Sequence, residues 1–82
     1  MKIATTDKKD LKKVLHSPLK NIFFEIKETL EENPYNPIQS FEKLVPPAAG
    51  FYSRRLNEQH RVVYKIFKKE RLVIIYSLWA HY

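Results

Sequence analysis

The sequence predicts one α+β domain, residues 1–82, in which two N-terminal helices pack on one face of a mostly antiparallel sheet, in the order β-α-α-β-β-β. Two observations carry this prediction. Apolar residues recur at helical spacing up to residue 33, whereas from residue 50 onward they follow the two-residue alternation of strands. Between the two halves, residues 34–49 contain four of the five prolines, which predicts a long connector without regular structure.

The N-terminal region predicts a short strand followed by a helix. Residues 1–5 are compatible with an edge strand. In residues 7–15, Leu11, Val14 and Leu15 fall on one helical face, and four lysines fall mostly on the others. A basic amphipathic helix is therefore expected directly after the strand.

A second amphipathic helix follows the motif Ser17-Pro18, in which the serine caps the helix and the proline occupies its first turn. The apolar stripe of this helix consists of Leu19, Ile22, Phe23, Ile26 and Leu30. Asn33-Pro34 ends the helix, because the residue before a proline avoids helical backbone angles. We expect the stripe to pack against the sheet.

Three strands are predicted in the C-terminal half. The first spans residues 51–56, and a turn at 57–59 leads to the second, residues 60–67, which is rich in β-branched and aromatic side chains. The charged segment 68–71 forms a hairpin tip before the third strand, residues 72–81. Because that strand is apolar on both faces, it should lie centrally in the sheet.

The charge of the chain favours an anionic partner. Fifteen Lys and Arg against nine Asp and Glu give a net charge of +6 and a pI of about 9.7. A small basic domain attracts nucleic acid by counterion release, although a domain that is merely basic is the plainer alternative. The absence of cysteine excludes a disulfide framework and thiolate chemistry. No apolar run is long enough for a bilayer and no signal peptide is visible, so we expect a cytoplasmic protein without a membrane partner.

Strand alternation sorts the basic residues onto one face of the sheet. Arg61 and Lys65 share a face of the second strand, and their neighbours Val62 and Tyr64 share the other. If the helices cover the apolar face, the open face carries the residues Arg55, Arg61, Lys65, His81 and Tyr82.

Such a set suits cleavage of RNA through its own 2′-hydroxyl. That reaction needs a base, a cation beside the phosphorane and an acid for the leaving 5′-oxygen, but no metal ion or other cofactor. His81 is the candidate acid, Arg61 can hold the phosphate with its planar fork, and Glu42 in the connector is a candidate base. Each also has a plainer interpretation: a solvated terminal histidine, a surface ion-pair partner and one acid among nine. Three scattered histidines and no clustered acids predict no metal site.

A family resemblance sharpens this hypothesis. Residues 50–64, GFYSRRLNEQHRVVY, closely resemble the core of the YoeB (Txe/YoeB) toxins, which belong to the RelE-like messenger RNA interferases. The chain also ends in His81-Tyr82, as those toxins do, and Phe41-Glu42-Lys43-Leu44 lies at the expected distance before Gly50 for the acid of the family. The resemblance is specific over residues 41–64 and 72–82.

The resemblance implies a RelE-like microbial ribonuclease fold and a function as the toxin of a type II toxin–antitoxin system. Such a toxin enters the ribosomal A site and cleaves messenger RNA there without a metal, which inhibits translation. The implied roles are Glu42 as general base, Arg61 as stabiliser of the transition state, His81 as general acid and Tyr82 as a residue that positions the RNA. The expected RNA-binding residues are Arg54, Arg55 and Lys65.

The resemblance also implies a partner, an acidic antitoxin of the YefM/Phd type whose C-terminal segment blocks the groove, and it allows a homodimer. Two other hypotheses stay open. The chain could be a non-catalytic RNA- or ribosome-binding module that uses the same basic face, or a protein-interaction subunit whose charge serves solubility. The combination of Glu42 with Arg61 and His81 favours the nuclease, because a carboxylate in a basic groove weakens simple phosphate binding.

Overall fold

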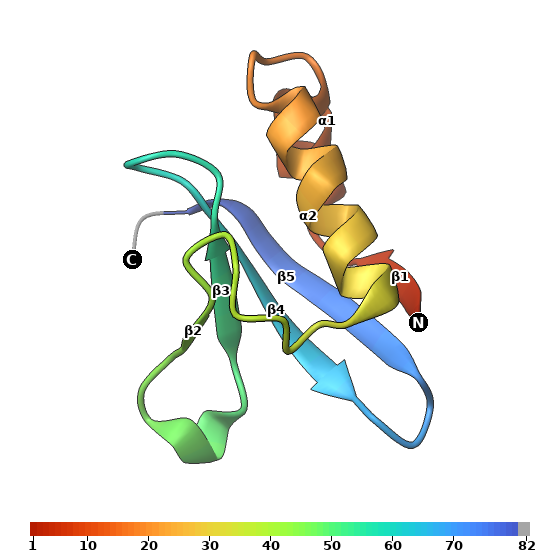
Figure 1. Cartoon of the computed structure of the whole chain (residues 1–82). Coiled ribbons are helices and arrows are strands. Elements are labelled where there is room, and N and C mark those ends of the chain that lie inside the picture. Colours follow the sequence, from red (N-terminus) through yellow and green to blue (C-terminus); the bar gives the residue numbers. More distant parts are fainter. Residues whose placement is uncertain (81–82) are drawn as a thin grey trace.

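The computed structural model describes residues 1–80, which form one five-stranded mixed sheet with two helices on one of its faces (Figure 1). The elements are, in chain order, β1 (Lys2–Thr5), α1 (Lys8–Leu15), α2 (Lys20–Glu32), β2 (Glu42–Lys43), a 3₁₀ turn η1 (Pro47–Ala49), β3 (Tyr52–Arg55), β4 (Arg61–Phe67) and β5 (Leu72–Ala80). The strand order is β1-β5-β4-β3-β2. Strand β1 runs parallel to β5, and the other neighbouring strands are antiparallel.

The predicted α+β class and the order of the helices and long strands are confirmed. Strand β5 lies inside the sheet between β1 and β4, as its apolar composition predicts. The connector prediction is wrong at two places, because β2 and η1 lie within residues 34–49. Residues 42–43 contain no proline, so both can pair with β3, and this short strand makes the sheet five-stranded.

The helix starts differ slightly from the predicted caps. The side chain of Asp7 caps α1 by accepting a hydrogen bond from the backbone N–H of Asp10 at 3.2 Å. Ser17 does not cap α2, which begins at Lys20. Its hydroxyl donates to the carbonyl of Val14 at 2.7 Å and accepts from the N–H of Leu19 at 3.1 Å, so it shapes the turn between the helices. Neither helix within the described residues is long and apolar enough to span a membrane.

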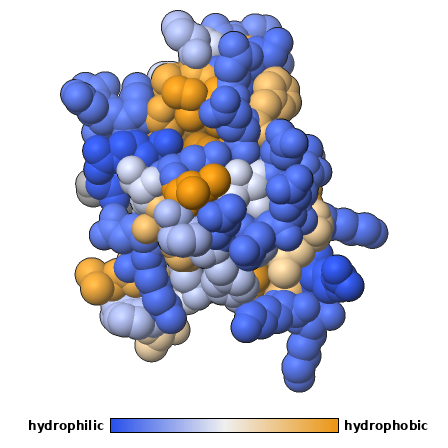
Figure 2. All heavy atoms as spheres, viewed as in Figure 1, coloured by the Kyte–Doolittle hydropathy of each residue, from blue (hydrophilic) through white to orange (hydrophobic). Residues whose placement is uncertain are grey.

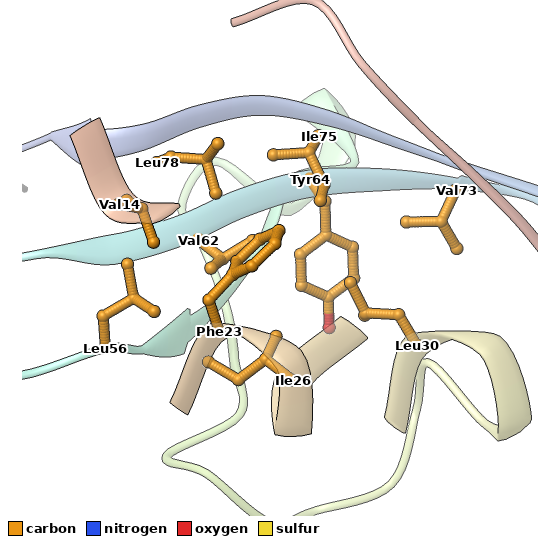
Figure 3. Packing of buried hydrophobic residues seen from close by; sticks show 10 residues of the cluster. All are labelled: Val14, Phe23, Ile26, Leu30, Leu56, Val62, Tyr64, Val73, Ile75 and Leu78. Atoms are coloured by element: carbon orange, nitrogen blue, oxygen red, sulfur yellow. The ribbon is translucent and has the colours of Figure 1, made fainter. Parts of the chain in front are cut away.

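The hydrophobic core lies between α2 and the helix-covered face of the sheet (Figure 3). The inner part of the predicted stripe is confirmed, since Phe23, Ile26 and Leu30 are buried, whereas Ile22 at its edge is 39% exposed. The side chains that meet them from α1 and the sheet are Val14, Leu56, Val62, Tyr64, Val73, Ile75 and Leu78. The outer surface in the view of Figure 2 is mostly hydrophilic, with small hydrophobic patches.

Strand β5 does not keep a strict alternation. The register against β4 shifts twice, once on each side of Val63, so β5 gains residues relative to its partner. The buried positions of β5 are consequently Val73, Ile75 and Leu78, which do not follow a strict two-residue alternation. Strict alternation from Val73 would place Ser77 on the same face as Ile75, whereas the register shift pairs Ser77 with Val63.

We predict that Ile26→Ala lowers the free energy of unfolding by about 2–5 kcal/mol, because it leaves a cavity in a fully buried site. Ile22→Ala is the matched control on the same helix, and it should cost less than about 1 kcal/mol, since Ile22 is 39% exposed and lies at the edge of the core. Urea denaturation of the three proteins measures both values. Equal losses at the two positions would contradict the packing described above.

Candidate active site

Glu42 and Arg61 form an ion pair on the face of the sheet that the helices leave open. A terminal nitrogen of Arg61 donates to a carboxylate oxygen of Glu42 at 3.3 Å. Glu42 pairs with Ser53 of β3, and Arg61 pairs with Arg55 of the same strand, so β3 lies between the two partners. The sheet thus brings together two predicted site residues that are 19 positions apart in the sequence.

The connector reaches this position because Arg54 holds it. The side chain of Arg54 is wholly buried on the helix-covered face of β3. One terminal nitrogen donates to the carbonyl of Ile38 at 2.8 Å, the other donates to the carbonyl of Pro34 at 2.8 Å, and Nε donates to the hydroxyl of Tyr64 at 3.0 Å. The hydroxyl of Tyr64 in turn donates to the carbonyl of Pro34 at 3.0 Å. Backbone carbonyls of the connector therefore satisfy a charge that belongs to the sheet.

Aromatic rings complete the attachment of the connector. Phe41, the residue before Glu42, stacks on Tyr52 with a ring-centroid separation of 5.4 Å, and Tyr52 stacks on Tyr64 at 5.9 Å. The guanidinium carbon of Arg54 lies 4.7 Å from the centre of the Phe41 ring. These contacts hold Phe41 against β3. The backbone of the next residue, Glu42, is therefore held beside its partner Ser53.

This placement corrects the prediction that Arg54 binds RNA. Its side chain has no exposed surface, and its guanidinium already serves acceptors of the connector and the sheet. Arg54 therefore has a structural role. The expectation failed because adjacent arginines in a strand point to opposite faces, and only Arg55 reaches the open one.

The other two predicted RNA-binding residues lie on the open face. Arg55 is exposed and pairs with Arg61 across the sheet. Lys65 is half-buried, and its ammonium lies 4.5 Å from the centre of the Phe51 ring. Sequence reasoning did not single out Phe51, nor Tyr76, whose ring meets it at a centroid distance of 5.7 Å. Continuing the alternation of β3 back to residue 51 could have identified Phe51, and the aromatic residue within β5 could have identified Tyr76.

Strand β5 ends beside the ion pair. Ala80, the last described residue, pairs with Arg61. The ring of His60, the residue before β4, stacks on the ring of Trp79, the residue before Ala80, with centroids 3.9 Å apart and planes 18° apart. The proposed catalytic residues His81 and Tyr82 lie outside the described residues.

The described site combines one carboxylate with three cationic side chains. A carboxylate can accept a proton, and Arg61 can present a planar fork of donors to a phosphate. Only 22% of the Arg61 side chain is exposed, against 58% of Glu42, so the guanidinium is the better fixed of the two groups. Within residues 1–80, no three His, Asp or Glu side chains gather closely enough to hold a metal ion.

Comparison with known sequences links this architecture to one family. Residues 4–82 match the family described as "YoeB-like toxin of bacterial type II toxin-antitoxin system". A similar curated relative is the toxin YoeB of Synechocystis sp., which is 38% identical over 64 residues, covering 78% of this chain and 71% of that protein.

Solved structures agree with the fold. A YoeB/ParE toxin from Agrobacterium tumefaciens superposes with a TM-score of 0.87 at 21% identity, covering both chains completely. The YoeB–YefM complex from Staphylococcus aureus gives 0.81, and the YoeB dimer from the same organism gives 0.84. Both are 26% identical and cover 100% of this chain and 98% of theirs.

The hydrogen bonds that link Arg54, Tyr64 and Pro34 predict how the stability of the fold changes at alkaline pH. Burial raises the pKa of Tyr64 to about 12, because the charged phenolate would lose its water. In the unfolded chain the same group titrates near its ordinary pKa of 10.0. The stability that depends on the neutral phenol is therefore complete below pH 10.0 and is lost as the pH rises toward about 12, by about 3 kcal/mol at most.

Tyr64→Phe removes this titration, and denaturation at several pH values measures the difference. The variant should be less stable than the parent at neutral pH, because Arg54 and the carbonyl of Pro34 each lose a hydrogen-bond partner. Between pH 10 and about 12 the parent should lose more stability than the variant, so the two curves converge. Parallel curves over this range would mean that the phenol does not titrate in a buried state.

Proposed function

This chain belongs to the YoeB family of toxins of bacterial type II toxin–antitoxin systems, and from that premise we propose that it is a metal-independent, ribosome-dependent endoribonuclease that cleaves messenger RNA. The observation that carries the proposal is the Glu42–Arg61 pair, which places a proton acceptor beside a phosphate-binding fork on the open face of the sheet. A surface that only bound RNA would gain nothing from a carboxylate at this point.

In the proposed reaction the RNA supplies the nucleophile. Glu42 accepts the proton of the 2′-hydroxyl while that oxygen forms a bond to the adjacent phosphorus. Arg61 stabilises the charge that develops on the phosphorane oxygens. The bond from phosphorus to the 5′-oxygen then breaks, and His81 donates a proton to the leaving oxygen. The products are a 2′,3′-cyclic phosphate and a free 5′-hydroxyl, and no step needs a metal ion.

The geometry of the ion pair suits the entry of a substrate. Exposed ion pairs in water contribute little free energy, so a phosphate can displace the Glu42 carboxylate from Arg61 at small cost. The same displacement frees the carboxylate to accept a proton. Strand β5 ends at Ala80, the partner of Arg61. The proposal assigns the role of acid to His81 and the positioning of the RNA to Tyr82.

Two cations on the open face support RNA binding. Arg55 flanks Arg61, and Lys65 lies farther along β4, so the phosphates of a single strand could contact both. We propose that this face binds messenger RNA in the A site of the ribosome, in the cytoplasm. Tyr82 would then position the RNA.

The partner that we propose is an acidic antitoxin of the YefM/Phd type. The toxin of Staphylococcus aureus, which shares the fold, is known in complex with YefM and as a dimer, and these assemblies support an antitoxin and a homodimer here. Carboxylates of such a partner would compete for Arg55, Arg61 and Lys65. Electrostatic attraction of this kind accelerates association and weakens as salt is added.

We predict that Arg61→Leu lowers the cleavage rate about 100- to 1000-fold, because it removes one preorganised donor to the transition state. Single-turnover cleavage of ribosome-bound message measures the rate. Lys69→Leu is the control, since it removes the same charge at the exposed hairpin tip and should cleave at nearly the parental rate. A folded Arg61→Leu variant with parental activity would remove Arg61 from the mechanism.

We predict that a message with a single 2′-deoxynucleotide on the 5′ side of the scissile phosphate resists cleavage, because it lacks the nucleophile. The unmodified message should yield a 2′,3′-cyclic or 3′-phosphate, identified by mass spectrometry. Efficient cleavage of the deoxy-substituted message would show that water is the nucleophile and would refute the proposed mechanism.

A further inference from the structure

A second cluster of side chains lies on the open face, next to the ion pair. The rings of Phe51 and Tyr76 meet edge to face, with centroids 5.7 Å apart and planes at 84°. The ammonium of Lys65 lies 4.5 Å from the centre of the Phe51 ring. Tyr76 is 37% exposed, and neither ring belongs to the hydrophobic core or packs against it. Core packing therefore does not account for two large rings at this place.

Sheet register fixes the distance of this cluster from the ion pair. Phe51 lies two residues before Ser53, which is the partner of Glu42, and Lys65 lies two residues after Val63, which is the other partner of Ser53. Two residues along a strand span about 7 Å. The cluster thus lies one row of side chains from the Glu42 row, a separation on the scale of one nucleotide of an extended RNA strand.

A register shift contributes to the position of Tyr76. Ile75 pairs with Tyr64 and Ser77 pairs with Val63, so Tyr76 is the additional residue between two paired neighbours. Such bulges re-aim a side chain and are common beside active sites. Here the bulge accompanies a ring that points to the open face, where it meets Phe51.

The chemistry of the cluster fits a nucleobase with its phosphate. Bases stack on exposed aromatic rings without regard to sequence, and a lysine beside the rings can contact the backbone that follows the base. The stem of Lys65 can stay on the Phe51 ring while its ammonium turns to a phosphate. Arg55 and Arg61 make the same face basic, so the charge complements RNA better than it complements a neutral peptide.

The geometry points to a base-binding subsite made of Phe51, Tyr76 and Lys65, which holds a nucleotide of the message next to the cleaved phosphate. This inference rests on the proposed function, because it names where a neighbouring base of the same RNA is bound. The subsite would act in substrate binding and would leave the chemical steps to the ion pair and the chain end.

The test combines protein variants with abasic nucleotides. Full-length toxin is bound to ribosomes carrying a message that is 2′-deoxy-substituted at the cleavage position, and the Kd is measured with the base removed at each flanking nucleotide in turn. For the parent, removal of the base at one flanking position should weaken binding about 10-fold. Phe51→Leu, which keeps an apolar side chain but lacks the ring, should bind the intact message about 10-fold less tightly and should show no further loss at that position.

Phe24→Leu is the matched control, because Phe24 is an exposed phenylalanine of α2, the helix that packs on the other face. It should retain the parental Kd and the parental sensitivity to base removal.

Tyr76→Leu is a second variant that should reproduce the effect if Phe51→Leu does not fold. If both ring variants bind less tightly than the parent but lose as much affinity as the parent does when each base is removed, the rings do not stack on a base and the inference is overturned. Because the message cannot be cleaved, that result would leave the proposed reaction standing. Failure of the parent to bind the programmed ribosome would overturn both.

Discussion

The buried guanidinium of Arg54 is the constraint on which the site depends. A charge without water must be satisfied completely, and all the hydrogen-bond partners of Arg54 within residues 1–80 are uncharged groups. Two of them are carbonyls of the proline-rich connector, at Pro34 and Ile38. Residues 34–38, with Pro34 and Pro37, form no helix or strand of their own, which leaves these carbonyls available. The connector and the arginine therefore require each other, and Glu42 occupies its place as a consequence.

The two faces of β3 separate stability from chemistry. On the covered face, Tyr52 and Arg54 attach the connector to the sheet through stacking and hydrogen bonds. On the open face, Ser53 and Arg55 are the register partners of Glu42 and Arg61. The carboxylate side chain of Glu42 is 58% exposed and can exchange partners, whereas Arg54, which holds the connector, is wholly buried. A rigid frame thus carries side chains that remain free to change partners.

Much of this arrangement could be predicted from periodicity. The spacing of Phe23, Ile26 and Leu30 predicted α2 and its buried side, and the alternation after Gly50 predicted three strands in the right order. Strand β2 escaped prediction because two residues have no period, and their pairing depends on a contact made elsewhere by Arg54. The break in alternation after Ile75 could not be predicted, because a strand that is apolar on both faces gives no sign of a register shift.

The stacked pair of His60 and Trp79 gives the molecule an optical property. Trp79 is the only tryptophan in the sequence, and both rings adjoin residues of the pair Arg61–Ala80. Emission from an indole depends on the position of the ring that is stacked on it. A ligand that moves Arg61 or the end of β5 would therefore change the fluorescence of the unlabelled protein. The chain carries its own reporter for events at the ion pair, so binding can be followed in real time without an attached dye.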